Sequence, residues 1–303
     1  MTKSAKLLSV AALLAVGIVT TLAIVMIGDS DSNGSGPTAD QSASAAQLSA
    51  KSGPYRSRPD LEPPPMKIIK DTAEASNQKL FIGSKVSGAI IYDANGEPIW
   101  FRPARAINFR KQTYRGKPVI TWFEGPSGKT NTRKNTYMIA NRNYKIIKRV
   151  YPGPGFSADS HEFRLTKRGT AFVTIYDTKF VNGRAVSDSI AQEIDVRTGR
   201  VVWQWRSLDH VPISDSFVSK FRKPGNPFDY FHINSIVGTS DGNILISGRG
   251  PNAVYKVSRR TGRIIWQLGG KRSDFKMGKR AAFHQQHDAQ MISKNKISIF
   301  DNS

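Results

Sequence analysis

The types and spacing of three histidines and one arginine suggest a catalytic or metal-binding site. The strings "DSHEF", "FHINS" and "QHDAQ" contain His161, His232 and His287, and "ILISGR" ends at Arg249. A neutral imidazole is a competent nucleophile toward sulfur or phosphorus, and arginine or protonated histidine stabilises charge on the transferring oxygens. Three histidines can also bind a metal ion. Because an adjacent arginine in a basic chain suits an oxyanion better than a cation, these residues predict group transfer.

The elements that must position these residues are short strands arranged in a repeat. From residue 79 onward, apolar and polar residues alternate between Gly, Asn and Asp turns, which is typical of β-hairpins. One hairpin type begins at the histidine, or at Asn108 in its first copy, and spans residues 108–124, 161–177, 232–248 and 287–302. A second hairpin type alternates with it, at residues 88–101, 136–150, 192–205 and 254–268.

Two hairpins in a fixed order make a four-stranded unit, and the repetition of such units predicts an all-β fold, a β-propeller of four-stranded blades. An all-β sandwich with accidental similarity is the alternative. The first strand of each propeller blade lines the central channel, so equivalent histidines of successive blades should converge. Arg249 ends the second strand of its hairpin and should therefore lie near His232. The alternative for the repeated histidine is a role in blade packing, as in WD40 repeats.

Four longer strings resemble the arylsulfotransferase family over residues 79–303: "DSHEFRLTKRGTAFVTIYD", "FDYFHINSIVGTSDGNILISGRG", "IIWQLGGKRSDF" and "FHQQHDAQ". The resemblance implies a six-bladed propeller at the cell envelope that transfers a sulfuryl group directly from one phenol to another. It also implies a sulfohistidine intermediate. Residue by residue, His287 resembles the nucleophile, His232 and Arg249 resemble the sulfate-binding and charge-stabilising pair, and His161 resembles a further active-site histidine.

The reaction implied by this resemblance is ping-pong, with an aryl sulfate as donor and a phenol as acceptor. His287 attacks sulfur, a phenolate leaves, and the acceptor phenol takes the sulfuryl group back from His287. Either His161 or His232 takes the proton of the acceptor. We expect no metal and no cofactor, because this chemistry requires neither.

A long aromatic insertion, residues 206–231, precedes His232. Its Phe228, Tyr230 and Phe231 are predicted to stack on the phenyl ring of the substrate, because long connections often carry binding residues. The alternative is that this connection simply packs onto the propeller.

The chain is strongly basic, with 45 Lys and Arg against 23 Asp and Glu and a net charge of +22. An excess of this size favours anionic partners such as sulfated ligands, anionic polymers or nucleic acid. The absence of cysteine excludes disulfides, thiolate catalysis and zinc–thiolate sites.

The N-terminus indicates export. Residues 7–28 carry no charge and follow Lys3 and Lys6, so residues 1–28 are predicted to form an uncleaved signal anchor, a single transmembrane helix with the rest of the chain outside the cytoplasm. A cleaved signal peptide and a secreted protein are the alternative. Either location argues against nucleic acid as a partner. Residues 29–66, first rich in Ser, Ala and Gly and then in Pro, are predicted to form a flexible linker.

The propeller domain is predicted at residues 67–303 and amounts to about four and a half blades, so we expect it to be incomplete at its C-terminus. Two other functions stay open: a non-catalytic, envelope-anchored propeller that acts as a binding or scaffold protein or a degraded paralogue, and a metal- or quinone-dependent envelope enzyme. The oligomeric state, the natural donor and the acceptor stay undetermined.

Overall fold

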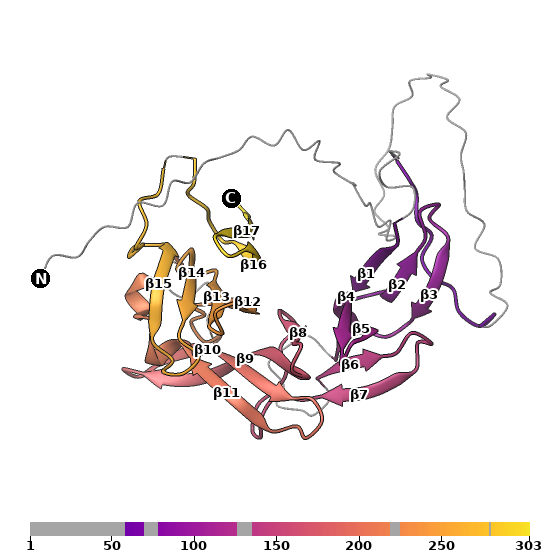
Figure 1. Cartoon of the computed structure of the whole chain (residues 1–303), viewed down its shortest axis with the longest axis horizontal. Helices are drawn as coiled ribbons and strands as arrows, with labels where there is room; N and C mark the ends of the chain where they lie inside the picture. Colours follow the sequence, from indigo (N-terminus) through magenta and orange to yellow (C-terminus); the bar gives the residue numbers. More distant parts are fainter. Residues whose placement is uncertain (1–57, 70–77, 126–134, 219–224, 279) are drawn as a thin grey trace, which may run out of the picture. The chain divides into compact units, whose positions relative to one another are not determined.

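The computed structural model describes residues 58–69, 78–125, 135–218, 225–278 and 280–303. The predicted signal anchor and residues 29–57 of the predicted linker lie outside these ranges. Strands make up nearly all the regular structure of the described residues (Figure 1). Within these ranges, no helix has the length and apolar character needed to cross a membrane.

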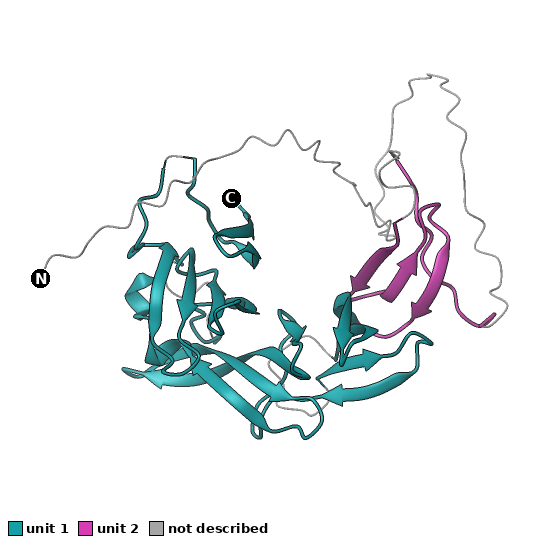
Figure 2. Cartoon of the chain, viewed as in Figure 1, with its two compact units in different colours: residues 1–11, 106–303 teal, residues 12–105 magenta. Residues whose placement is uncertain are grey.

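The chain divides into two compact units (Figure 2). The described part of the smaller unit is residues 58–69 and 78–105, and that of the larger unit is the described residues from 106 to 303. The smaller unit is a three-stranded antiparallel sheet in the order β1-β2-β3, with bounds β1 Leu80–Ser84, β2 Gly88–Tyr92 and β3 Pro98–Arg102. The central strand β2 is buried along its whole length. The hydroxyl of Tyr92 donates a hydrogen bond to the carbonyl of Pro64 (2.5 Å), which fastens the proline-rich segment to this sheet.

The larger unit consists of successive antiparallel sheets, each built from consecutive strands. The first sheet has the strands β4 Ala106–Tyr114, β5 Lys117–Glu124, β6 Thr136–Ala140 and β7 Ile146–Val150. The second has β8 Phe163–Leu165, β9 Thr170–Val181, β10 Arg184–Asp195 and β11 Val201–Arg206. The third has β12 Ile233–Gly238, β13 Ile244–Gly248, β14 Ala253–Val257 and β15 Ile264–Gly269. A two-stranded sheet follows, with β16 His287–Ser293 and β17 Lys296–Phe300.

Every hairpin predicted from the sequence repeat forms in the structure. The histidine-type hairpins are β4–β5, β8–β9, β12–β13 and β16–β17, and the second type is β2–β3, β6–β7, β10–β11 and β14–β15. The alternating pattern therefore predicted both the strands and the order in which they pair.

Apolar layers between neighbouring sheets hold the larger unit together. Phe123, Tyr137 and Phe163 belong to a cluster shared by the first and second sheets. Phe172 and Ile236 belong to one shared by the second and third sheets. A smaller cluster joins the third sheet to β16 and β17. Within this unit, the opening strands β8, β12 and β16 lie on the inner side of the succession, whereas β11 and β15 lie on the outer side (Figure 1). The starts of the opening strands are thus brought together.

The insertion between the second and third sheets contains two 3-10 helices, η1 Ser207–Asp209 and η2 Ile213–Asp215. Its end is tied to β10 through a parallel bridge between Val186 and Phe228. The connection therefore packs along the sheets that it links.

Candidate active site

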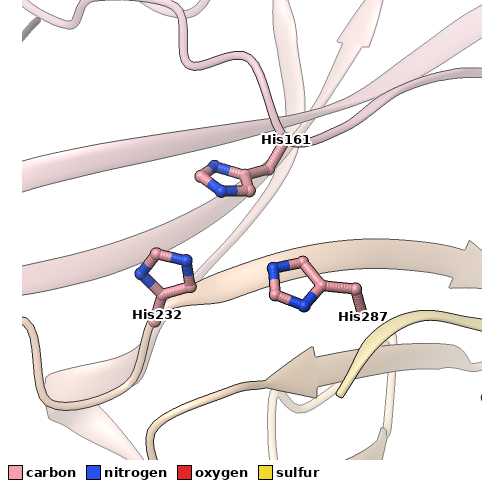
Figure 3. Close-up of side chains that lie close together, drawn as sticks. All are labelled: His161, His232 and His287. Atoms are coloured by element: carbon pink, nitrogen blue, oxygen red, sulfur yellow. The ribbon is translucent and has the colours of Figure 1, made fainter. Parts of the chain in front are cut away.

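The three histidines of the repeat meet in one cluster, which we call the histidine cluster (Figure 3). The ring centroids of His161 and His232 are 4.9 Å apart, those of His161 and His287 6.2 Å, and those of His232 and His287 6.1 Å. His161 and His232 lie just before β8 and β12, and His287 is the first residue of β16. Residues separated by more than fifty positions thus converge where the inner strands begin, as the repeat predicts.

Backbone irregularities mark the strand starts at His232 and His287. The pairing register shifts between Ile233 and Ser235 and between His287 and Gln290, and His232 has a positive φ of 54°. A β-bulge of this kind bends the strand and redirects a side chain. A hydrogen bond joins the third and last sheets beside these residues: the side-chain nitrogen of Asn234 donates to the backbone carbonyl of Gln286 at 2.8 Å.

His161 is held by a carboxylate. Its Nδ1 lies 2.7 Å from Asp159 Oδ1, which also accepts hydrogen bonds from the His161 amide (2.9 Å) and the Thr174 hydroxyl (2.9 Å). Burial alone would raise the pKa of Asp159, but the charge of His161 and these hydrogen bonds outweigh it and lower the pKa. Asp159 is therefore an acceptor for Nδ1–H of His161 and fixes the orientation of this ring.

His232 has the same kind of partner. Its Nδ1 lies 2.6 Å from Oδ2 of Asp229. The other oxygen of this carboxylate, Oδ1, is buried and has no hydrogen-bond partner among the described residues. Neither aspartate was predicted from the sequence, although an aspartate two or three residues before a repeated histidine is a signal that could have identified them.

His287 has a different partner. Its Nδ1 lies 3.0 Å from the backbone carbonyl oxygen of Gln285. The side-chain nitrogen of Asn302 donates to this carbonyl at 2.9 Å and lies 2.8 Å from Nδ1 of His287. Burial lowers the pKa of His287, the Gln285 carbonyl opposes this, and the positive charges of His232, His161 and Arg249 lower it further. The ring of His287 is therefore neutral near pH 7. The Gln285 carbonyl can only accept, which fits a ring proton on Nδ1, whereas the NH2 group of Asn302 can only donate, which fits a lone pair on Nδ1. Attack on a substrate through Nε2 requires the first of these two tautomers.

Arg249 lies beside His232, as the hairpin geometry predicts. Its backbone N–H donates to the carbonyl of His232 (3.0 Å), and its Nη2 donates to Gln285 Oε1 (2.6 Å). The guanidinium thus reaches from one histidine to the residues preceding another. Planar guanidinium groups bind oxyanions through paired N–H donors.

Tyr176, on β9, forms a wall of the cluster that the sequence analysis also missed. Its ring centroid lies 5.8 Å from that of His161 and 5.7 Å from that of His232, and its hydroxyl donates to the Ile233 carbonyl (2.7 Å). Burial and then the charges of Asp159 and Asp229 raise the pKa of Tyr176 well above the ordinary value, although the charge of Arg249 lowers it. Tyr176 therefore stays protonated.

The aromatic residues predicted to stack on a substrate ring belong to the core. Tyr230 and Phe231 are fully buried and Phe228 is nearly so, within the apolar cluster between the second and third sheets. The structure does not bring these rings to the surface of the histidine cluster, so their burial favours the alternative, packing of the connection. A ring that packs against core neighbours on all sides has no face free for a ligand.

Tyr230 and Phe231 nevertheless help to place Arg249. The amides of Arg249 and Gly250 donate to the carbonyls of His232 and Phe231, at 3.0 and 2.9 Å. A Cβ at Gly250 would lie 2.0 Å from the carbonyl oxygen of Tyr230, so this close approach requires glycine. The string "SGRG" therefore reflects how closely the backbone must pass the aromatic segment.

The histidine cluster has features of both an oxyanion site and a metal site. Its ligand nitrogens all lie within 4.8 Å of one another. A tetrahedral zinc would need nitrogens about 3.4 Å apart, so the rings would have to approach one another to bind it. A carboxylate or carbonyl behind each Nδ1 is common behind metal-bound histidines. The adjacent Arg249 instead favours an anion.

Comparison with known proteins identifies a family. The family model described as Arylsulfotransferase (ASST) matches residues 110–303, more than half of the chain. No curated protein matches the chain. Among solved structures, the extracellular domain of the hybrid two-component system BT3049 from B. thetaiotaomicron has 13% identity and a TM-score of 0.41, with 74% of this chain and 27% of that one covered. A protein of unknown function from Bacteroides caccae has 13% identity and a TM-score of 0.27, with 63% of this chain and 77% of that one covered. Neither structural likeness carries an argument about function.

Proposed function

Since this chain belongs to the arylsulfotransferase family, we propose that it transfers a sulfuryl group from an aryl sulfate to a phenol through a sulfohistidine at His287. The observation that supports this most is the convergence of three imidazoles and Arg249 from three separate sheets. Aryl sulfotransfer needs a nucleophile, charge stabilisation and a proton carrier within reach of one sulfur atom, and this set of residues supplies all three.

In the first half-reaction, Nε2 of His287 attacks sulfur while the bond between sulfur and the aryl oxygen breaks. The lowered pKa of His287 supports this role, because only the neutral ring is a nucleophile. Arg249 and His232 bind the sulfonate oxygens, and the weakly basic phenolate leaves to solvent, where it takes up a proton.

In the second half-reaction, the oxygen of the acceptor phenol attacks sulfur and the bond between sulfur and His287 breaks. We assign the proton of the acceptor to His161 rather than His232. The backbone hydrogen bond between Arg249 and His232 places these two residues together for binding the sulfonate, which leaves His161, whose Nδ1 lies 2.7 Å from Asp159, for the proton. His161 then releases this proton to solvent, which balances the phenolate set free in the first half-reaction.

The architecture that we propose with this function is the family's six-bladed β-propeller, of which the repeated sheets of the larger unit would be blades. Residues 67–303 would form the domain, outside the cytoplasm and attached to the membrane by residues 1–28. Digestion of intact cells by an added protease tests this location: an extracytoplasmic domain is cleaved without lysis.

The activity is tested with a fluorogenic aryl sulfate such as 4-methylumbelliferyl sulfate. We expect release of the fluorescent phenol that a second phenol accelerates, together with sulfation of that second phenol. Peptide mapping at mildly alkaline pH, where a bond between nitrogen and sulfur survives, should find the sulfuryl group on the peptide that contains His287. An adduct on another residue, or none, would contradict the proposal.

A second candidate function is metal-dependent catalysis, favoured by the carboxylate-backed histidines within 4.8 Å of one another. It predicts stoichiometric zinc or copper after dialysis and activity that a chelator removes. Sulfotransfer through His287 predicts activity that a chelator leaves unchanged.

A further inference from the structure

A cleft of about 590 Å³ lies on the larger unit and is lined by residues of β4, β8 and the turns that follow them. The lining residues are Arg110, Lys111, Gln112, Thr113, Arg115, Gly116, Arg164, Leu165, Thr166 and Lys167. His161 precedes β8, whereas Leu165 ends it and Lys167 lies in the turn beyond. The cleft therefore extends toward the opposite end of this strand.

The lining of this basic cleft carries five cationic side chains and no carboxylate. One buried acid, Glu162, lies behind it and binds Arg110 at 3.0 Å and Arg164 at 3.4 Å. Asp288 lies 3.8 Å from Arg164. Lys111, Arg115 and Lys167 form no ion pair within the described part of the chain. The cleft thus concentrates positive charge that the described residues neutralise only in part.

The walls of the cleft are already fixed by hydrogen bonds. The side-chain nitrogen of Gln112 donates to the Phe163 carbonyl (2.8 Å) and to the Thr121 hydroxyl (2.7 Å). The side-chain oxygen of Gln112 accepts from the backbone N–H of Leu165 (2.8 Å). These bonds hold β4 and β8 side by side. A preformed site loses less entropy when a ligand binds, which increases affinity.

The guanidinium groups of Arg110 and Arg164 are held in place by hydrogen bonds within the protein. Arg110 donates to Asn108 through Nε (2.7 Å) and to Glu162 through Nη2 (3.0 Å), and Arg164 donates to Glu162 through Nε and Nη2, both at 3.4 Å. Within the described residues, Nη1 of each arginine has no acceptor. Arginine donors held by a buried carboxylate are suited to charge-assisted hydrogen bonds with an oxyanion.

We propose that this basic cleft binds a short polyanion that carries several sulfate or phosphate ester groups. A cleft of 590 Å³ accommodates more than one such group, and three unpaired cations beside two arginines can bind several anionic groups at once. The net charge of +22 would attract such a ligand from a distance. None of the lining residues belongs to the histidine cluster, and the proposal does not depend on the sulfotransfer proposed above.

Isothermal titration calorimetry of the full chain with sucrose octasulfate and with inositol hexakisphosphate tests this site, with sucrose as the uncharged control. We expect saturable one-to-one binding of at least one polyanion, weakened by added salt, and none of sucrose. The preferred compound shows whether the site favours sulfate or phosphate esters.

The decisive variant is Lys111→Gln/Lys167→Gln, which should lower the affinity at least about tenfold because two charge-assisted contacts are lost. Its matched control, Arg142→Gln/Lys145→Gln, removes the same charge from the exposed turn between β6 and β7. The control should change the affinity far less. Equal losses in both double variants, or no binding by the parent chain, would overturn the proposal.

His287→Ala separates this proposal from the proposed activity. We expect the variant to bind the polyanion as the parent does, whether or not the parent transfers sulfate. If the variant loses polyanion binding, the ligand occupies the histidine cluster and the basic cleft is not its site.

Discussion

The histidines of the second and third sheets differ from that of the last sheet in what lies behind the ring. His161 and His232 each have a carboxylate at Nδ1, whereas His287 has the carbonyl of Gln285. A carboxylate favours the protonated ring, and an uncharged carbonyl stabilises it less. Equivalent positions of a repeat can therefore hold imidazoles suited to different tasks: acid–base and anion-binding roles for the first two, and a nucleophilic role for the third.

Replacing His287 with alanine tests this contrast with the largest expected effect. If His287 is the nucleophile, His287→Ala should lower turnover of an aryl sulfate by about 10³-fold or more and abolish the sulfuryl adduct. His284→Ala, three residues earlier and exposed, is the control and should stay active. Full activity of His287→Ala in the fluorescence assay would assign the chemistry elsewhere.

Arg249 is expected to have the next largest effect. Arg249→Ala should lower kcat/KM by about 10²–10³-fold, because a charge that stabilises the transferring oxygens is lost. Arg263→Ala removes the same charge from an exposed turn and should change kcat/KM little. Similar losses in the two variants would mean that general attraction of the anionic substrate, and not local stabilisation, is measured.

Asp159 and Asp229, which contact Nδ1 of His161 and His232, test whether these two histidines have separate roles. Asp159→Asn and Asp229→Asn should each lower kcat about 10–100-fold, since a neutral amide supports a protonated imidazole less well. Asp159→Asn should slow transfer to the acceptor and preserve the initial burst of fluorescent phenol. Asp229→Asn should instead slow the burst, because His232 binds the sulfonate. Identical effects on both phases, measured by stopped-flow, would contradict separate roles.

The pH dependence of the burst tests the different environment of His287. Burial, and the charges of His232, His161 and Arg249, lower its pKa below the ordinary value of 6.5, although the Gln285 carbonyl opposes them. The neutral ring therefore persists below pH 6.5, and the burst rate should fall only at lower pH, by about tenfold per pH unit. Arg249→Ala removes one of the lowering charges, so it should move this decline to higher pH. A decline that begins above pH 6.5 in the parent would contradict the lowered pKa.

The smallest effect is expected in the buried aromatic segment. Tyr230→Phe removes the hydrogen bond from the Tyr230 hydroxyl to the Val211 carbonyl (3.1 Å) and should lower the free energy of unfolding by about 1 kcal/mol. It should leave KM for aryl sulfates unchanged, because the ring is fully buried. If KM increases strongly while denaturant titration shows no loss of stability, Tyr230 belongs to the substrate site.

Much of the fold of the described residues follows from local patterns in the sequence. Alternating apolar residues and Gly or Asn turns predicted the hairpins, because strand period and turn geometry depend on residues near one another. The repeat also predicted that His161, His232 and His287 converge and that Arg249 lies beside His232. The predicted anchor at residues 1–28 and residues 29–57 of the predicted linker lie outside the described residues and stay predictions.

Other features could not be predicted, because they depend on burial and on contacts between sheets. Phe228 and its aromatic neighbours have the composition of a binding surface, and only their packing against the second and third sheets shows that they belong to the core. Arg110 and Arg164 are distant in sequence, and Glu162 brings them to one cleft.

The sequence by itself determined the strands, their order and the repeat position of the three histidines, since each of these depends on local pattern and spacing. Only the tertiary structure decided that Asp159 and Asp229 support two of the rings while a carbonyl supports the third. The physical reason is that a proton on an imidazole responds to charges and acceptors within a few ångströms, and the neighbours at that distance are set by how the sheets pack.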